Sequence, residues 1–258
     1  LATLDGEGLP HLSLITTLRA KSPEQLLWGQ FCEGRSKSNV REHPQVGFLC
    51  MTMKREIWRG RARWTHASQQ GTDYELLNQS PMFRYNAYFG IHTVHYMDVE
   101  AVSDREGLPL PGVAAGLLST AITRIAARSG LGPPILTPWA TRLLARPDTL
   151  KFLAYVREDG FPEIVPALPC LAADSRRLVF APTVYRPLLT SFTRGATVAV
   201  FGLNLSMESV LVRGTFAGYG GLRRLGTGII DINWVYNSMP PKFGVVYPAQ
   251  PLDPVTHF

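Results

Sequence analysis

The sequence predicts a mainly β protein with a helical connector, in which two tandem β-barrels form a pseudo-dimer within one chain. Three observations predict this fold class. Residues 1–16 are similar to residues 153–168 without a gap. Both regions continue as short apolar segments separated by turns with glycine, a pattern that is typical of small barrels. The segment between them instead spaces its apolar residues as a helix does.

The internal repeat is the strongest of these observations. LATLDGEGLPHLSLIT at the start of the chain corresponds to LAYVREDGFPEIVPAL at 153–168, and the correspondence continues as PQVGF with ATVAV and as IWRG with LVRG. A similarity this long indicates a duplicated structural unit. The chain of 258 residues is long enough for two cores. We therefore expect a first repeat at 1–109, a connector at 110–146 and a second repeat at 147–258.

Each repeat is expected to contain five strands, and the first also a short helix. In the first repeat, a turn rich in glycine and acid separates the first two strands. A polar segment before Pro44 favours one short helix. The expected strands are 1–4, 10–17, 25–31, 46–52 and 56–64, with the helix at 36–43; in the second repeat they are 152–156, 163–168, 177–181, 197–201 and 210–218.

The connector is expected to hold two helices, 113–128 and one that begins at 138–145. The apolar residues of the first helix are Leu117, Leu118, Ala121, Ile122 and Ile125. We expect this face to pack against the barrels, because most amphipathic helices of globular proteins do so. Binding of the basic, apolar helix to a lipid surface is the alternative.

Composition limits the classes of partner. The net charge is +6, but no run of five basic residues occurs, so we expect no nucleic-acid partner. No run of about 18 apolar residues occurs, so we expect no membrane partner either. Cys32, Cys50 and Cys170 follow no metal or disulfide spacing, which favours free thiols in a reducing compartment and a cytoplasmic protein. Whether a leader precedes Leu1 is left open by the sequence.

The order of the sequence motifs resembles that of a known protein family. L-A-T-L-D-x-x-G-x-P-H-L-S is followed by a strand, by R-S-K-S-N-V-R-E-H-P-Q-V-G-F and by W-R-G-R-A. This order resembles the FMN-binding split-barrel superfamily, which includes the pyridoxamine 5′-phosphate oxidases, over about 1–64 and more loosely over 153–219. The resemblance implies tandem split barrels, FMN at the interface of the two, and a flavin-dependent oxidoreductase. The substrate-binding signature of true pyridoxamine phosphate oxidases is absent, so we do not expect that activity.

The resemblance also implies a phosphate site after the third strand. In this sequence its residues are Arg35, Ser36, Lys37 and Asn39. A guanidinium, an ammonium, a hydroxyl and a helix N-terminus together favour a dianionic phosphate. The alternative is a solvated loop with a serine cap. In the family, the strand that corresponds to 10–17 approaches the flavin ring, which makes Ser13 a further candidate.

Two later segments are expected to complete the flavin site. Residues 78–90 and 236–244 both combine Asn, Ser, Pro, Met, a cation and Phe-Gly, a set that suits stacking on a flavin and hydrogen bonding to its edge. The candidates here are Arg84, Asn237 and Lys242. Packed loops are the alternative for both segments.

The second repeat lacks the phosphate-binding residue types. Pro187, Leu188 and Leu189 stand where the first repeat has Arg-Ser-Lys, and Arg186 alone is basic nearby. We therefore expect at most one flavin per chain. His92 and His95 lie three apart and would face opposite sides of a strand, so no shared metal site is expected, although either could be an axial ligand of haem.

The preferred interpretation is an FMN-binding flavoprotein, an oxidoreductase whose partner is a small-molecule substrate or electron donor, as a monomer with pseudo-twofold symmetry or as a homodimer. The sequence identifies no catalytic acid or base. The alternatives are a deazaflavin in place of FMN, a non-catalytic flavin- or haem-binding protein, and an apo pseudo-dimer whose site has decayed.

Overall fold

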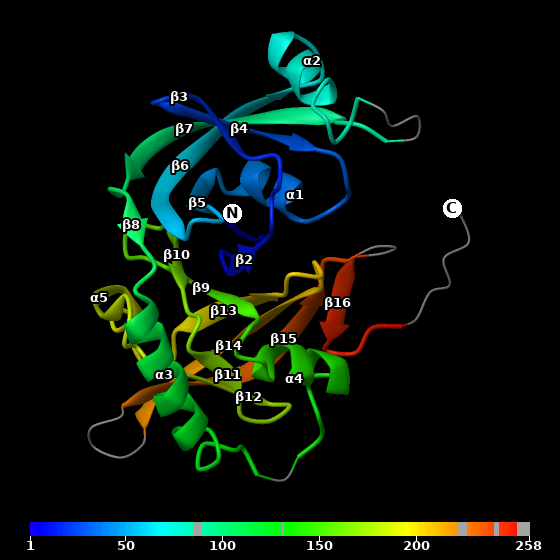
Figure 1. Cartoon of the computed structure of the whole chain (residues 1–258). Coiled ribbons are helices and arrows are strands. Elements are labelled where there is room, and N and C mark those ends of the chain that lie inside the picture. The colour runs from blue at the N-terminus through cyan, green and yellow to red at the C-terminus, as the bar shows by residue number, and fades with distance from the viewer. Residues whose placement is uncertain (85–88, 131, 221–225, 240–242, 252–258) are drawn as a thin grey trace. The chain divides into compact units, whose positions relative to one another are not determined.

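The computed structural model describes residues 1–84, 89–130, 132–220, 226–239 and 243–251, and the chain is mainly β with few helices (Figure 1). The first part of the chain contains β1 (Ala2–Leu4), β2 (Pro10–Leu12), β3 (Arg19–Ser22), β4 (Gln25–Gln30), α1 (Ser36–Glu42), β5 (Gln45–Met51), β6 (Glu56–Ser68), α2 (Thr72–Asn78), β7 (Thr93–Val102) and β8 (Glu106–Gly107). The two connector helices are α3 (Leu110–Thr123) and α4 (Pro138–Ala145). The rest contains β9 (Leu150–Val156), β10 (Pro162–Pro166), β11 (Cys170–Ala172), β12 (Arg177–Phe180), α5 (Arg186–Leu189), β13 (Thr197–Leu203), β14 (Ser209–Gly220), β15 (Thr227–Asn237) and β16 (Gly244–Tyr247).

Two eight-stranded antiparallel sheets have the same strand order. The first runs β2-β1-β5-β6-β7-β4-β3, with β8 beside β6. The second runs β10-β9-β13-β14-β15-β12-β11, with β16 beside β15. Each strand of the first path has its counterpart at the same place in the second path. The prediction of a tandem, split-barrel-like β fold with a helical connector is therefore confirmed.

The first turn of each repeat shows the duplication at the level of single hydrogen bonds. Gly8 and Gly160 correspond in the sequence and both have a positive φ, 73° and 81°, which side chains rarely tolerate. The Gly8 amide donates to the carbonyl of Asp5 at 2.7 Å, and the Gly160 amide donates to that of Arg157 at 3.0 Å. The same φ at the same place explains why glycine occurs in both turns.

A second pair of glycines permits close contact between strands. Gly60 on β6 and Gly214 on β14 correspond in the IWRG and LVRG motifs. A Cβ at Gly60 would lie 2.2 Å from the carbonyl oxygen of Ala101, and one at Gly214 would lie 2.4 Å from that of Asp231. These distances are shorter than van der Waals contact, so each site requires glycine where β6 meets β7 and where β14 meets β15.

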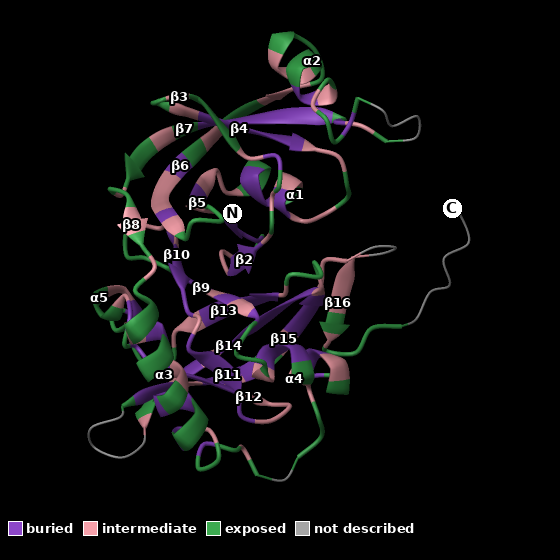
Figure 2. Ribbon diagram, in the orientation of Figure 1, coloured by how far each residue is buried: buried purple, intermediate pink, exposed green. Residues whose placement is uncertain are grey.

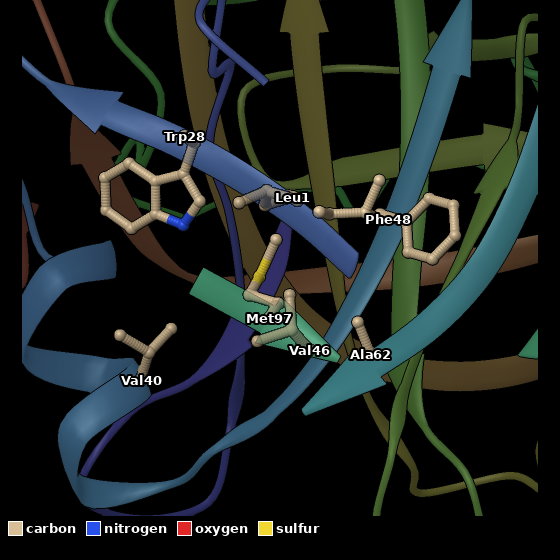
Figure 3. Packing of buried hydrophobic residues seen from close by; sticks show 8 residues of the cluster. Leu1, Trp28, Val40, Val46, Phe48, Ala62 and Met97 are labelled. Carbon is tan, nitrogen blue, oxygen red and sulfur yellow. The ribbon is translucent and has the colours of Figure 1, made fainter. Parts of the chain in front are cut away.

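The core beneath the first sheet is built from the alternating faces of its strands and from α1 (Figure 3). Trp28 on β4, Val46 and Phe48 on β5, and Met97 on β7 are all buried. Val40 of α1 is fully buried against them, which fixes how the helix lies on the sheet. The other buried members of this cluster are Leu1, Leu26 and Ala62.

Several boundaries differ from the predictions. The expected strand 10–17 ends at Leu12, and β6 continues beyond 64 to Ser68. The corresponding long strands β7 and β15 were not predicted, and neither were the shorter strands β3, β8, β11 and β16. Strand β3 is polar, and β11 has only three residues. Among the helices, α4 has the expected bounds and α1 ends one residue before His43. Helix α3 begins and ends earlier than the expected 113–128, and α2 and α5 were not predicted.

The predicted orientation of the first connector helix is wrong. The buried residues of α3 are Val113, Gly116, Ser119, Thr120 and Thr123. The aliphatic face expected to pack inward is instead exposed, with Leu118 at 65%, Ile122 at 52% and Ile125 at 66% (Figure 2). Small and hydroxyl side chains let the helix approach β11, β12 and β15 closely, and this contact decided the orientation.

The chain folds into two compact units. Unit 1 comprises 1–108 together with 154–165, and unit 2 comprises 109–153 together with 166–258. The hairpin of β9 and β10 is therefore largely part of unit 1, whereas both connector helices belong to unit 2. The boundaries expected from the repeat, 109/110 and 146/147, stay a prediction. Within the described residues, no helix is long and apolar enough to span a membrane.

Candidate functional site

Helix α1 in unit 1 places two cations on one face. The helix begins at Ser36, and it ends at Glu42, two residues before Pro44, which cannot continue it. Lys37 and Arg41 lie four residues apart, so they are neighbours on the helix surface. Asn39 and Val40 between them are buried and hold the helix on the sheet. The two cations therefore project from the side of the helix that the core does not use.

Both cations line a pocket of about 350 Å³ beside the end of β4. Its other lining residues are Gln30, Phe31, Cys32, Glu33, Gln69, His92 and Thr93. A second pocket of about 460 Å³ is lined by Arg41, Ala67, Ser68, Gln69, Gln70 and Thr93. The two pockets share Arg41, Gln69 and Thr93, so we treat them as one recess and call it the α1 recess.

The charges of the α1 recess favour an anion. Lys37 forms an ion pair with Glu33, which lies four residues earlier and also lines the recess. Arg41 is exposed and forms no ion pair within the described residues. A guanidinium without a carboxylate partner is available for a planar, bidentate contact with phosphate or carboxylate. The carboxylate of Glu33 opposes anion binding, but the lining keeps a net positive charge.

Polar groups that are not charged form the opposite wall. The amide of Gln69 lies 3.3 Å from Oγ1 of Thr93 and 3.3 Å from Nδ1 of His92. Nδ1 of His92 also lies 2.8 Å from Oγ1 of Thr93. These three side chains come from the end of β6 and the start of β7, and they present both donors and acceptors. His92 is exposed, so its ring is accessible to a ligand.

His95 lies behind this wall and is fully buried. Its ring stacks on Trp28 with 4.0 Å between the ring centroids. Nε1 of Trp64 donates to Nδ1 of His95 at 3.3 Å, and Nε2 of His95 lies 3.3 Å from Oε1 of Gln30. Both ring nitrogens are therefore engaged, and the ring is held neutral.

Burial first, and then the positive charges of Arg41 and Lys37, lower the pKa of His95 from 6.5 to about 4. A histidine whose two nitrogens already have partners in the interior is a poor haem ligand, so His92 is the candidate of the pair. One residue is exposed and the other buried, as expected for a strand. No group of three or more metal-ligating side chains occurs in the part of the chain that the structure describes.

Aromatic rings stand at the apolar side of the recess. Phe31 lines it directly. The Phe31 centroid lies 5.2 Å from that of Phe83 and 6.4 Å from that of Phe89. Phe83 is buried, so the cluster is anchored in the core of unit 1. Phe83 and Phe89 of the segment 78–90 thus pack on Phe31. Tyr85 and Tyr88 lie outside the described residues.

The predicted phosphate residues are brought together only in part. Oγ of Ser36 donates to Oγ of Ser13 at 2.8 Å, so these two candidates are neighbours. Nδ2 of Asn39 donates to Oγ1 of Thr3 at 2.9 Å, and Asn39 is buried, so its amide supports the fold. Lys37 is the member of the set that lines the recess, and the described lining does not include Arg35.

The candidates from the two later segments are scattered. Arg84 is exposed in a turn after α2, and its amide donates to the carbonyl of Ser80 at 3.0 Å. Asn237 belongs to unit 2, where its side chain accepts from the amide of Met239 and donates to the carbonyl of the same residue. That geometry is a local turn, as in the alternative interpretation. Lys242 lies outside the described residues.

Sequence reasoning missed Arg41, Gln69, Gln30 and Thr93. The signal for Arg41 is present in the sequence, because it lies one helical turn after Lys37. Gln69 and Thr93 come from the far end of β6 and the start of β7, and no local pattern connects them with α1. In the second repeat, α5 stands between β12 and β13 as α1 stands between β4 and β5. There Leu189 is buried where Lys37 is charged.

Comparison with known proteins gives a likeness of fold. No known protein family and no curated protein matches the chain. A variant of HupZ from Group A Streptococcus is similar with a TM-score of 0.34 and 16% identity, over 41% of this chain and 86% of that one. An FMN-binding protein from Syntrophomonas wolfei is similar with a TM-score of 0.34 and 11% identity, over 42% and 75%. HupZ itself is similar with a TM-score of 0.33 and 15% identity, over 40% and 94%.

Proposed function

We propose that the α1 recess of unit 1 binds FMN and that the protein is a flavin-dependent oxidoreductase. The observation that carries the proposal is Arg41, which forms no ion pair among the described residues, beside Lys37 in a recess lined by amide and hydroxyl groups. Two cations fit the charge of a phosphate dianion. Gln30, Gln69 and Thr93 offer hydrogen bonds to the polar parts of the flavin, and Phe31 offers an apolar contact for its ring.

The residues present fit the cofactor in size and in chemistry. A pocket of about 350 Å³ that adjoins a second of about 460 Å³ lies in the range of small-molecule sites. FMN, when bound, supplies electron transfer as a hydride or as single electrons. The chain's own residues would hold the phosphate through Lys37 and Arg41 and orient the ring through Phe31. No residue of the recess is assigned as a catalytic acid or base.

The proposal is tested with the double variant Lys37→Ala/Arg41→Ala. Each charge-assisted bond to phosphate contributes about 1.5–3 kcal/mol when sheltered, and less at an open mouth. We expect FMN affinity to fall about ten- to a hundredfold, as measured by quenching of flavin fluorescence. Riboflavin has no phosphate, so its affinity should change little, and this comparison excludes a misfolded variant.

Arg35→Ala is the control, because it removes a positive charge directly before α1 without altering the described lining of the recess. A large loss of FMN affinity in Arg35→Ala, with none in the double variant, would favour the site expected from the sequence over the α1 recess. If neither variant changes FMN binding, the phosphate is held elsewhere and the proposal fails.

Stoichiometry gives an independent test. The second repeat has Leu189 buried where the first has Lys37 lining the recess. We therefore expect titration with FMN to saturate at one equivalent per chain. Saturation at two equivalents would show that the cations of α1 are not required.

Haem is the second candidate, because His92 is an accessible imidazole in the recess. The spectrum of the purified protein separates the cofactors, since haem gives a Soret band and flavin does not. A Soret band that is lost in His92→Ala would favour haem over FMN. A deazaflavin would share the phosphate contacts and would be identified by its own absorption.

A further inference from the structure

Helix α3 presents an apolar face that nothing in the described structure covers. The exposed aliphatic residues are Leu110, Leu118, Ile122 and Ile125, with exposed fractions of 44%, 65%, 52% and 66%. Ala114 and Ala121 complete the row and are also exposed. Four and three residues separate the large members Leu118, Ile122 and Ile125, so they form one stripe along α3 and the turn that follows it, which contains Ile125. Exposed apolar residues scattered singly need no explanation, but a contiguous stripe does.

The stripe cannot turn inward, because the other face of the helix is fixed by specific contacts. Oγ1 of Thr120 donates to the carbonyl of Pro169 at 2.7 Å, and Oγ1 of Thr183 donates to that of Gly112 at 2.9 Å. A Cβ at Gly116 would lie 2.3 Å from Oγ1 of Thr183, so glycine is required for this approach. Rotation of α3 about its axis would break both hydrogen bonds.

The segment of the chain that contains the stripe carries charges of one sign. From Gly107 to Pro147 the sequence contains no aspartate or glutamate, and it contains Arg124, Arg128, Arg142 and Arg146. Arg128 and Arg142 are exposed, whereas Arg146 pairs with Asp148 just beyond this segment. Near the end of the helix, the carboxylate of Asp174 accepts hydrogen bonds from the amide and the hydroxyl of Ser129. It is therefore engaged locally.

We propose that α3 is the docking surface of the protein for an anionic lipid membrane. Aliphatic side chains flanked by arginines, without acidic residues, match the interface of such a membrane, where apolar groups enter the acyl boundary and cations meet lipid phosphates. The helix has 14 residues and lies on the surface of unit 2, so it lies along the membrane instead of crossing it. This proposal is independent of the FMN site and reverses the expectation of no membrane partner.

A second copy of the chain is the less suitable occupant. In a parallel symmetric contact through α3, Arg124 and Arg128 of one copy would meet the same residues of the other, and in an antiparallel one they would meet the N-terminal half of its helix. The segment has no carboxylate to pair with them. Like charges at an interface oppose association, whereas lipid phosphates neutralise them.

Flotation of the full chain with vesicles tests the proposal. One set of vesicles contains phosphatidylcholine alone, and the other contains phosphatidylcholine with phosphatidylglycerol. We expect binding to the anionic set, weakening with added salt. In Leu118→Ser/Ile122→Ser we expect binding about tenfold weaker or more, because two aliphatic groups no longer enter the bilayer.

The controls are Leu76→Ser on α2 and Leu205→Ser in the β13–β14 loop, which replace leucines with exposed fractions of 54% and 87%. Both variants should bind vesicles as the unaltered protein does. Circular dichroism confirms that each variant is folded. Absence of binding to anionic vesicles, equal binding to neutral ones, or unchanged binding of the double variant would each overturn the proposal. A dimer in sedimentation velocity that the double variant loses, without vesicle binding, would assign the face to a second copy.

Discussion

Replacement of Lys151 by methionine is expected to raise the free energy of unfolding by about 1–3 kcal/mol at pH 7. Lys151 on β9 is fully buried in unit 2. Its ammonium donates a hydrogen bond to the carbonyl of Arg146, but no carboxylate pairs with it among the described residues. Burial lowers the pKa of Lys151 from 10.5 to about 8. Methionine has a similar length and carries no charge that must be desolvated.

The sign of the pH dependence follows from this pKa. Between pH 8 and 10.5 the unfolded chain holds the proton of Lys151 and the folded chain does not, so the contribution of this group to stability rises with pH. At pH 7 the folded protein bears the whole cost of keeping Lys151 charged in the interior. Because one pKa unit corresponds to 1.36 kcal/mol, this cost is about 3 kcal/mol, from which the contribution of the hydrogen bond that the variant loses is subtracted. The advantage of the methionine variant is therefore largest at pH 7 and shrinks towards pH 10.

Urea denaturation of both proteins at several pH values measures this difference. Other groups also titrate in the alkaline range: burial raises the pKa of Cys170 to about 12, which lowers stability above pH 9 in both proteins. The charge of Lys151 itself lowers the pKa of Cys170, so the two proteins are compared between pH 7 and 9, before this thiol titrates. Lys54→Met, at an exposed position, is the matched control and should not change stability. A methionine variant less stable than the unaltered protein would show that the bond to Arg146 outweighs the cost of burial.

The repeat made the fold class predictable from sequence, because a duplicated strand order needs duplicated turns and close contacts. These local requirements can be recognised in the sequence as glycines at matching positions: Gly8 and Gly160 in the turns, and Gly60 and Gly214 between strands. The start of α4 was predictable for the same reason, since Thr137 caps the helix and Pro138 begins it.

Features that depend on distant parts of the chain were not predictable in this way. The apolar stripe of α3 indicated a core-facing helix, but Thr120 and Gly116 dock against Pro169 and Thr183 and leave the stripe outside. Asn39 of α1 has the residue type of a ligand, yet its amide donates to Thr3 of β1. Hydrophobic spacing reports which face is apolar, and tertiary packing decides which face is buried.

The candidate site likewise contains residues that the sequence could predict and residues that only the folded chain brings together. Lys37 was predicted from its place in a motif. Arg41 could have been found from helical spacing alone, whereas Gln69 and Thr93 enter the recess through the pairing of β6 with β7. The recess is therefore a property of the folded sheet, and the motif supplied one of its walls.

His95 is expected to make the protein less stable as pH falls from 6.5 to 4. Its pKa is lowered from 6.5 to about 4, first by burial and then by the charges of Arg41 and Lys37. Within that range the unfolded chain binds a proton at this residue and the folded chain does not, so stability falls with pH and levels off below pH 4. The shift corresponds to a loss of about 2–3 kcal/mol.

The comparison that isolates this effect uses His95→Gln, which keeps an amide near Trp64 and Gln30 but cannot titrate. The variant is expected to be less stable at pH 7, because the stacking on Trp28 is lost, and to lose less stability than the unaltered protein between pH 6.5 and 4. His92→Gln, at the exposed histidine of the same strand region, should keep the full pH dependence. The ionised carboxylates of Asp73 and Asp174 have lowered pKa values, so their losses begin at lower pH. If His95→Gln retains the acid sensitivity of the unaltered protein, His95 titrates in the folded state as an ordinary histidine, and the stacked, doubly bonded ring does not hold it neutral.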